Sequence, residues 1–478
     1  MRGLIKRGSP ARRDVCALTL LALLLDLFHL GTTSIVLDES VSVAFARLSF
    51  WPLLRRLAGA GDPNMSLYYV LLNLWVRMFG ESEAAVRSLS AIFAVLAVSA
   101  IYLLGVRLFG RTVGFVAGLL LALDAFITQY AQTARSYTLL VLLVTLSSYF
   151  LVVELERPSR RGRIGYVLAS TLAVYAHYFA AYVLFVHLGT VVAMKRRTAL
   201  KREWLGMAVA VLLLCSPEAI VAYRTGAGQI AWIKRPSLNA IRPVLEELAG
   251  GSRLLLLALL AGGCYATVSA VRERRYWRQG FVAAWLVVPV VLSFAVSFVR
   301  PMFVRQYLII CVPALVLFGT AAIARLRRPA LVGLFVVPLV WLSAAQLFVF
   351  YRRERGENWR AATRYVLASA RPGDAVVFYP DYARAPFEYY QRQSEVAGPA
   401  NLKGQALAGG QRIWLVIRES DAAANSTEFR QLQASLAERY SAAERRGFHR
   451  VRVELYEGRP RQASSTPNFG FEHSAHSR

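Results

Sequence analysis

The sequence contains few acidic residues and very few cysteines. Its 478 residues include 29 Asp and Glu against 56 Lys and Arg, which gives a net charge of +27. All four cysteines lie in apolar segments, and their spacing is not that of a metal site: Cys16, Cys215, Cys264 and Cys311. This pattern excludes a cysteine-based metal centre and predicts four small buried hydrophobic side chains.

Several kinds of sequence pattern are also missing. We find no short segments of alternating hydrophobicity, no repeats of fixed period and no inverted internal symmetry. These absences exclude a β-barrel and a solenoid, and disfavour a transporter built from inverted repeats. The N-terminal stretch MRGLIKRGSPARRDVCALTLLALLL resembles a signal peptide, but no convincing small-residue cleavage site follows it. We therefore expect an uncleaved first membrane span.

Long apolar runs are abundant. Hydrophobic residues make up 56% of the chain, the mean hydropathy is +0.42, and many runs approach the roughly 20 residues that cross a bilayer. The pattern predicts an α-helical polytopic membrane protein with about eleven transmembrane helices. The expected spans lie near 15–36, 84–106, 112–130, 136–154, 164–177, 179–194, 204–223, 252–271, 280–299, 305–324 and 330–350.

The basic residues are concentrated in alternate loops between these spans. Nucleic-acid binding would explain such an excess in a soluble protein, whereas in a membrane protein the positive-inside rule explains it directly. Under that rule the N-terminus is cytoplasmic and everything after residue 351 lies outside. With that orientation, we expect the C-terminal domain to be periplasmic or extracellular.

Two regions differ from the spans. Residues 37–83 form a long first outer loop with two amphipathic stretches, VSVAFARLSFWPLLRRL and SLYYVLLNLWVRMFG, which we expect to lie in the membrane interface. After the transmembrane domain, residues 1–351, the chain turns to strand-like and helix-like segments. This predicts a small α/β domain over 352–460 and a disordered tail over 461–478.

Charged residues from separate loops converge on the predicted outer face. They are Asp38, Glu39, Asp62, Arg135, His177 and Arg305. A carboxylate can act as general base toward a hydroxyl, and arginines can hold a phosphate and stabilise charge that develops on it. Together these groups indicate transfer of a sugar from a lipid phosphate to an acceptor at the membrane surface.

Simpler roles remain open for four of these residues. Asp38 and Glu39 would also suit the N-terminus of a helix, Arg135 could reach for lipid headgroups, and His177 could be an interfacial histidine. Two other functions also stay open. A flippase or transporter of lipid-linked sugars would have polar groups near the bilayer midplane, and a polymerase or ligase of surface polysaccharide would concentrate its arginines in one late loop.

Several stretches resemble one family. They are LDES at the start of the first outer loop, DPNMSLYYVLLNLW, FGESEAAVRSLSAIFAVL, YLLGVRLFGRTVGFVAGLLLALDAFITQYAQTARSYTLLVLL and RQYLIICVPALVLF. They resemble the GT-C superfamily of membrane glycosyltransferases, in particular the bacterial relatives of protein O-mannosyltransferase and of aminoarabinose transferase. The similarity is strongest over residues 35–155.

The resemblance implies an inverting glycosyltransferase that takes its sugar, a hexose or pentose, from a polyprenyl-phosphate carrier. Asp38 is then the catalytic base, Glu39 contacts the acceptor or the lipid phosphate, and Arg135 and Arg305 lie near the donor phosphate. His177 and Asp62 are further substrate-binding candidates, although relatives often have His-Pro-Pro where this chain has Asp62-Pro63-Asn64. In some relatives the acidic residue helps to hold a divalent metal ion, the one cofactor that the resemblance suggests. The acceptor is a glycan, a lipid or a protein.

Overall fold

The computed structural model describes residues 10–59, 63–194, 198–226, 233–274, 276–394, 400–401, 412–419 and 426–458. The chain divides into two compact units. The first comprises Met1–Thr33 and Asp38–Arg355, and the second comprises Ser34–Leu37 and the chain from Gly356 onward. Asp62 and the tail predicted over 461–478 lie outside the described residues.

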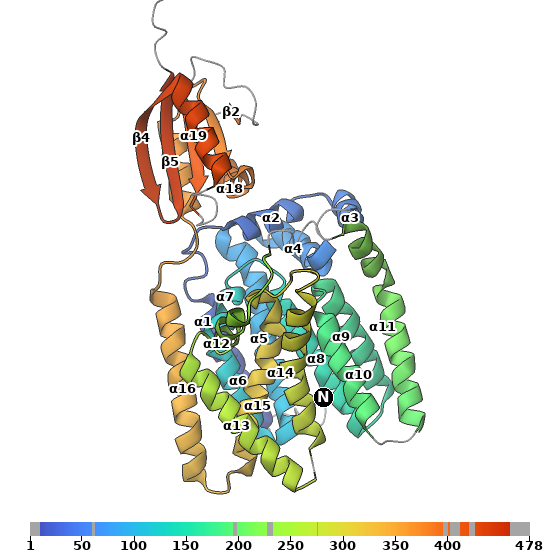
Figure 1. Ribbon diagram of the computed structural model, residues 1–478. Helices are drawn as coiled ribbons and strands as arrows, with labels where there is room; N and C mark the ends of the chain where they lie inside the picture. The colour runs from blue at the N-terminus through green and yellow to red at the C-terminus, as the bar shows by residue number, and fades with distance from the viewer. Residues whose placement is uncertain are drawn as a thin grey trace, which may run out of the picture. The chain divides into compact units, whose positions relative to one another are not determined.

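The first unit is a bundle of helices (Figure 1). Those that correspond to the predicted spans are α1 (Pro10–Leu27), α5 (Glu83–Phe109), α6 (Arg111–Ala122) with α7 (Ala125–Ala131), α8 (Tyr137–Glu156), α9 (Arg160–Ala176), α10 (Ala180–Ala193), α11 (Thr198–Thr225), α13 (Arg253–Arg272), α14 (Trp277–Val296), α15 (Val312–Thr320) and α16 (Pro329–Arg352). The 3₁₀ turns η4 (Arg305–Cys311) and η5 (Ala321–Arg325) extend α15 at its two ends, and η3 (Leu238–Ala240) precedes the short helix α12 (Ile241–Glu247).

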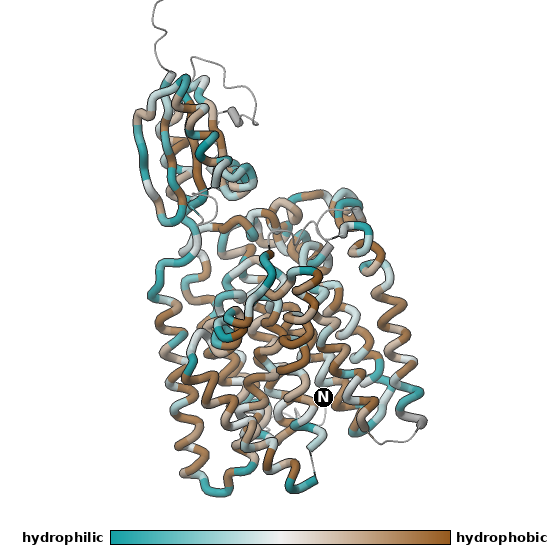
Figure 2. The backbone as a smooth tube through the Cα atoms, in the orientation of Figure 1, coloured by the Kyte–Doolittle hydropathy of each residue, from teal (hydrophilic) through white to brown (hydrophobic). Residues whose placement is uncertain are grey.

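Within the described ranges, seven of these helical segments are long and apolar enough to cross a membrane. The number is eight if α6 and α7, which bend by 59° at their junction, form one broken span. Figure 2 shows hydrophobic residues along most of each long helix and hydrophilic residues gathered near the loops. The prediction of a polytopic α-helical membrane protein is therefore confirmed.

The helices differ in how deeply they are buried. α5 and α8 lie in the centre of the bundle with most of their side chains buried, whereas α11 and α16 expose most of theirs. Small residues let α5 and α6 approach closely, as is usual where helices pack inside membranes. A Cβ atom added at Gly105 of α5 would lie 2.8 Å from the Cα atom of Gly114 in α6.

The first outer loop is helical, as its amphipathic pattern predicts. It contains α2 (Leu37–Ala46), α3 (Phe50–Ala58), η1 (Pro63–Met65) and α4 (Ser66–Phe79). The first amphipathic stretch is broken into α2 and α3, and Asn73 of α4 holds the break. Its side-chain amide donates to the carbonyl oxygens of Ala46 and Leu48, both at 2.7 Å. These helices run across one end of the bundle (Figure 1).

The second unit contains a five-stranded sheet with strand order β2-β1-β3-β5-β4. Its strands are β1 (Ala375–Tyr379), β2 (Ala400–Asn401), β3 (Ile413–Arg418), β4 (Tyr440–Phe448) and β5 (Val451–Gly458), and its helices are α17 (Trp359–Ser369), η6 (Asp381–Ala383), α18 (Arg384–Gln393) and α19 (Thr427–Arg439). β1 is parallel to β2 and β3, whereas β5 is antiparallel to β3 and β4. The expected α/β class of this domain is confirmed.

The prediction of four buried cysteines is wrong for two of them. Cys215 and Cys311 are buried, but Cys16 and Cys264 are exposed. The exposed pair lies on the apolar spans α1 and α13, where an outward face meets lipid rather than water. An apolar segment therefore does not imply a buried side chain in a membrane protein.

Candidate active site

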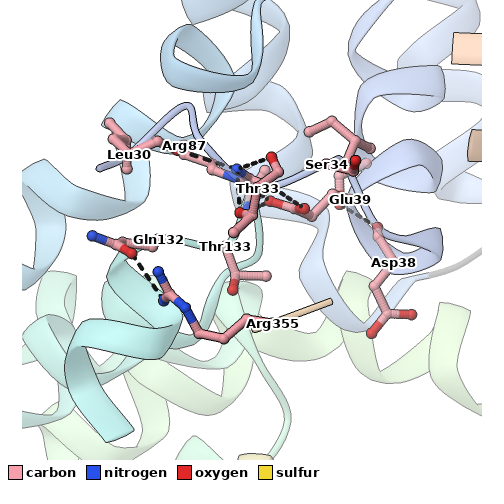
Figure 3. A network of polar contacts seen from close by, with 12 residues as sticks. Leu30, Thr33, Ser34, Asp38, Glu39, Arg87, Gln132, Thr133 and Arg355 are labelled. Carbon is pink, nitrogen blue, oxygen red and sulfur yellow. Dashed lines mark hydrogen bonds and ion pairs between the residues drawn. The ribbon is translucent and has the colours of Figure 1, made fainter. Parts of the chain in front are cut away.

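The adjacent carboxylates Asp38 and Glu39 occupy the first turn of α2. Successive side chains of an α-helix point about 100° apart, so the two cannot share one environment when one face of the helix is buried. Glu39 is only 1% exposed, whereas Asp38 is exposed. Figure 3 shows the Asp38 carboxylate pointing away from the polar network that surrounds Glu39.

Glu39 forms a buried, bidentate ion pair with Arg87 of α5. The Nε and Nη2 groups of Arg87 each donate to a different carboxylate oxygen, both at 2.7 Å. The backbone N–H of Ala134 donates to Glu39 Oε1 at 3.0 Å. Arg87 also donates through Nη1 to the carbonyl oxygens of Leu30 (3.1 Å) and Thr33 (2.9 Å). The network ties α2 to the end of the first span, to α5 and to the turn before α8.

This geometry favours a positioning role for Glu39 over the contact with the acceptor or the lipid phosphate that the resemblance implies. Its carboxylate is held by three donors and is closed off from solvent, so an acceptor hydroxyl or a lipid phosphate has no access to it. These three hydrogen bonds fix the orientation of α2, and they therefore also fix the direction in which Asp38 points.

Asp38 is available for chemistry. Within the described part of the chain, its carboxylate has no hydrogen-bond or ion-pair partner. The contact of Asp38 within α2 uses its backbone, because the Ser42 hydroxyl donates to the Asp38 carbonyl oxygen at 3.1 Å. An exposed carboxylate without a competing donor is a suitable base for a nearby hydroxyl.

Arg135 lies in the turn between α7 and α8. Its carbonyl oxygen accepts a hydrogen bond from the Ser90 hydroxyl at 3.1 Å, which anchors the turn to α5. Its guanidinium donates through Nη1 to the Tyr69 hydroxyl of α4 at 3.4 Å. Tyr69 in turn stacks on Phe45 of α2, with ring centroids 4.6 Å apart. Arg135 is thus tied to the helix that carries Asp38.

The Tyr130 hydroxyl lies within electrostatic range of four charged side chains. The charges of Asp38, Arg135, Arg305 and Glu247 all act on it electrostatically. Arg305, at the start of η4, is 55% exposed and lies 3.7 Å from the Glu247 carboxylate at the end of α12. Three predicted site residues from distant parts of the sequence therefore share one neighbourhood, together with an acidic residue that the sequence analysis did not select.

His177 lies in an aromatic cluster beside these charges. The rings of Tyr130, Tyr137, His177 and Tyr307 follow one another with centroid distances of 4.6, 6.0 and 4.8 Å. His177 is only 1% exposed, and its Nε2 lies 3.2 Å from the side-chain amide nitrogen of Asn64. The arrangement favours a supporting role for His177 over the direct substrate contact that the sequence predicts.

A further arginine stands near this network after the end of α16. Arg355 donates through Nη1 to Gln132 Oε1 at 3.1 Å (Figure 3). Gln132 in turn donates to the carbonyl oxygens of Asp26 and Phe28. Burial lowers the pKa of the Arg355 guanidinium, and the positive charge of nearby Arg87 lowers it further. Through Gln132, Arg355 is tied to the end of the first span, the segment that Arg87 also binds through Leu30.

The residues that the structure describes do not fit the divalent metal ion that the resemblance suggests. No group of three His, Cys, Asp or Glu side chains suitable for a metal occurs among the described residues. Both oxygens of Glu39 are already engaged by Arg87, which leaves Asp38 as the accessible carboxylate of the pair. We derive no catalytic step through a metal.

Comparisons with known proteins agree with this architecture. The family model described as dolichyl-phosphate-mannose-protein mannosyltransferase matches residues 62–220. No curated protein sequence matches significantly.

Similar solved structures include ArnT from Cupriavidus metallidurans in the apo state. It has a TM-score of 0.61 at 14% identity, covering 94% of this chain and 98% of that one. The structure of the same protein bound to undecaprenyl phosphate has a TM-score of 0.58 at 13% identity, covering 92% of this chain and 97% of that one. The arabinofuranosyltransferase AftD from Mycobacteria has a TM-score of 0.53 at 14% identity, covering 93% of this chain and 41% of that one. The chain therefore has the GT-C fold, that of the membrane glycosyltransferases.

Proposed function

We propose that this protein transfers a sugar from a polyprenyl-phosphate carrier to an acceptor hydroxyl, with inversion at the anomeric carbon. The observation that carries the proposal is the exposed Asp38 carboxylate on α2, to which Arg135 is tied through Tyr69 and Phe45. Arg305 stands two residues before Tyr307, whose ring contacts His177 in the aromatic cluster. A base and phosphate-binding cations are the groups that such a transfer needs. The solved structure of ArnT with undecaprenyl phosphate supports a lipid-phosphate donor for this fold.

The chemistry follows from these groups. As the acceptor oxygen attacks the anomeric carbon, its proton passes to the Asp38 carboxylate. The bond between the anomeric carbon and the phosphate oxygen breaks through an oxocarbenium-like transition state. The bond electrons remain on that oxygen, so the phosphate changes from a singly charged diester to a doubly charged monoester. Arg135 and Arg305 stabilise the added negative charge.

The proposal places the reaction on the outer face of a bacterial inner membrane. Arginines at the opposite ends of the spans support this orientation under the positive-inside rule. Arg107 lies in the last turn of α5, Arg278 in the first turn of α14 and Arg325 at the end of η5. Arg107 lies 20 residues after Arg87 in α5, about 30 Å along the helix axis from the partner of Glu39, and Arg278 pairs with the same Glu156 as Arg107. The N-terminus is then cytoplasmic, and the second unit lies outside.

The test uses purified protein in liposomes with radiolabelled undecaprenyl-phosphate sugars, both hexoses and pentoses, and extracted envelope material as acceptor. We expect label to move from the carrier to a new product. If label instead crosses the bilayer while still attached to the carrier, the protein is a flippase and the proposal is wrong. Growth of the product into a ladder of repeating units would make it a polysaccharide polymerase.

Arg135→Gln is expected to lower the transfer rate about 10-fold to 100-fold. The variant removes one charged hydrogen bond to the phosphate, a loss of about 1.5–3 kcal/mol. Initial rates at saturating donor measure the effect. Lys234→Gln is the control, because Lys234 is exposed on the polypeptide before η3 and forms no hydrogen bond or ion pair among the described residues. Equal rates for the two variants would remove Arg135 from the donor site.

Glu247→Gln is expected to strengthen donor binding twofold to fivefold. The Glu247 carboxylate pairs with Arg305 and therefore competes with a donor phosphate for this guanidinium. An exposed ion pair of this kind contributes up to about 1 kcal/mol. The measurement is the Kd for undecaprenyl phosphate. Glu246→Gln serves as control, since Glu246 pairs with Arg242 on its own helix. A weaker Kd in Glu247→Gln would mean that Glu247 helps to hold the donor.

A further inference from the structure

A cavity of about 570 Å³ lies between α10 and α14, away from the candidate active site. Its lining comes from the C-terminal half of α10, from Phe185 to Met194, and from the N-terminal half of α14, from Trp277 to Val288. The aromatic cluster adjoins the other end of α10. Thr190 is thirteen residues from His177, about 20 Å along a helix axis. The volume falls within the range of ligand sites, about 300–1,000 Å³.

Two glycines line this cavity. A Cβ atom built on Gly189 of α10 or on Gly280 of α14 would meet no atom within 4 Å, so both positions face open space. Larger side chains there would fill the cavity without striking the backbone. Phe185, Val186 and Phe281 give it an apolar wall that suits a hydrocarbon chain.

One end of the cavity carries groups suited to a lipid headgroup. Arg274, exposed in the short connection between α13 and α14, lines the cavity with Tyr276 and Trp277. Its backbone has a φ of +54°, in the left-handed region that few non-glycine residues adopt. Glu273, the acidic residue beside it, is paired with Arg325. Among the described residues, the Arg274 guanidinium has no carboxylate partner.

This combination is typical of a lipid site. Tyrosine and tryptophan favour the level of the headgroups, and basic pockets between membrane helices attract anionic lipids. We propose that the cavity binds one anionic phospholipid, whose acyl chain lies between α10 and α14 and whose phosphate pairs with Arg274. The site is separate from the donor site, so it does not depend on the proposed transfer reaction.

The test compares lipid binding in purified, delipidated protein reconstituted in phosphatidylcholine nanodiscs. Radiolabelled phosphatidylglycerol is titrated as the probe. We expect one saturable site in the wild type, and at least a tenfold weaker Kd in Gly280→Leu, which fills the cavity. Gly333→Leu in α16 is the matched control, because a Cβ atom at Gly333 also meets open space but on another helix.

A second pair of variants tests the headgroup contact. Arg274→Gln is expected to abolish the preference for phosphatidylglycerol over phosphatidylcholine, whereas Arg272→Gln, exposed at the end of α13, retains it. Gly189→Leu fills the same cavity from the opposite helix and replaces Gly280→Leu if that variant does not fold. Equal binding by wild-type and cavity-filled proteins would overturn the proposal. Displacement of the probe by an equal concentration of undecaprenyl phosphate would overturn it too, because the cavity would then hold the donor lipid.

Discussion

Asp38→Asn is expected to lower the rate of sugar transfer by about 10²–10⁴-fold, the usual contribution of a general base. Asparagine has nearly the same size as aspartate but cannot accept the acceptor proton. Because Asp38 is exposed and its carboxylate holds no other side chain among the described residues, the substitution leaves α2 and its packing intact. The loss should therefore appear in kcat, with donor binding little changed.

The measurement is single-turnover transfer from a labelled undecaprenyl-phosphate sugar, together with the Kd for undecaprenyl phosphate and the thermal stability of each variant. Glu246→Gln makes the same chemical change in α12 and is the matched control. Unchanged transfer in Asp38→Asn would show that another group takes the proton. Asp62 and Glu247 would then be the remaining carboxylates to test, because Glu39 is already occupied by Arg87.

A transfer rate of Asp38→Asn that recovers with rising pH would support Asp38 as the base. An acceptor hydroxyl activated by solvent hydroxide needs no protein base, and a variant that lacks the base should approach the wild-type rate at high pH. If Asp38 only oriented the acceptor, the loss in Asp38→Asn would stay constant with pH. The pH profile of the variant thus separates proton transfer from positioning.

The sequence predicts the spans well because the composition of each span reflects the lipid that surrounds it. A helix in lipid must be apolar along its length, and this local property is readable without any knowledge of neighbours. The interfacial helices α2, α3 and α4 are readable in the same way from their amphipathic pattern. The break between α2 and α3 is not, because it depends on Asn73, a residue 25 or more positions away from the carbonyl groups that it binds.

The site is predicted less completely, and Asp38 and Glu39 show why. The two adjacent carboxylates indicate a polar site at the start of α2. They do not say which of the two faces inward, since that depends on where Arg87 lies in the fold. Arg87 itself left a signal, because a charged residue inside an apolar stretch needs a partner. Its position in FGESEAAVRSLSAIFAVL belongs to the family resemblance, but the motif does not name the partner.

Glu247 left no such signal. It stands in an ordinary short helix, α12, and its partner Arg305 lies 58 positions further along the chain. Only the fold brings the two together beside Tyr130. Contacts between distant segments are the part of a site that composition and spacing do not contain.

The largest effect on stability is expected when the Glu39–Arg87 ion pair is broken. Arg87→Met is expected to destabilise the protein by about 3–5 kcal/mol, because it leaves a buried carboxylate without its partner. The double variant Glu39→Gln with Arg87→Met removes the uncompensated charge, so it should recover part of the loss. The measurement is denaturant unfolding in detergent micelles, followed by tryptophan fluorescence.

Arg47→Met is the matched control for this prediction. Arg47 pairs with Glu81 at 2.6 Å within the same outer loop, but both side chains are partly exposed, and such a pair contributes about 1 kcal/mol or less. A similar cost for Arg47→Met and Arg87→Met would mean that the buried network does not hold α2. If Arg87→Met instead costs several kcal/mol while the double variant is stable but slow in transfer, then the pair serves to position Asp38. Catalysis by an exposed carboxylate would in that case depend on the buried one beside it.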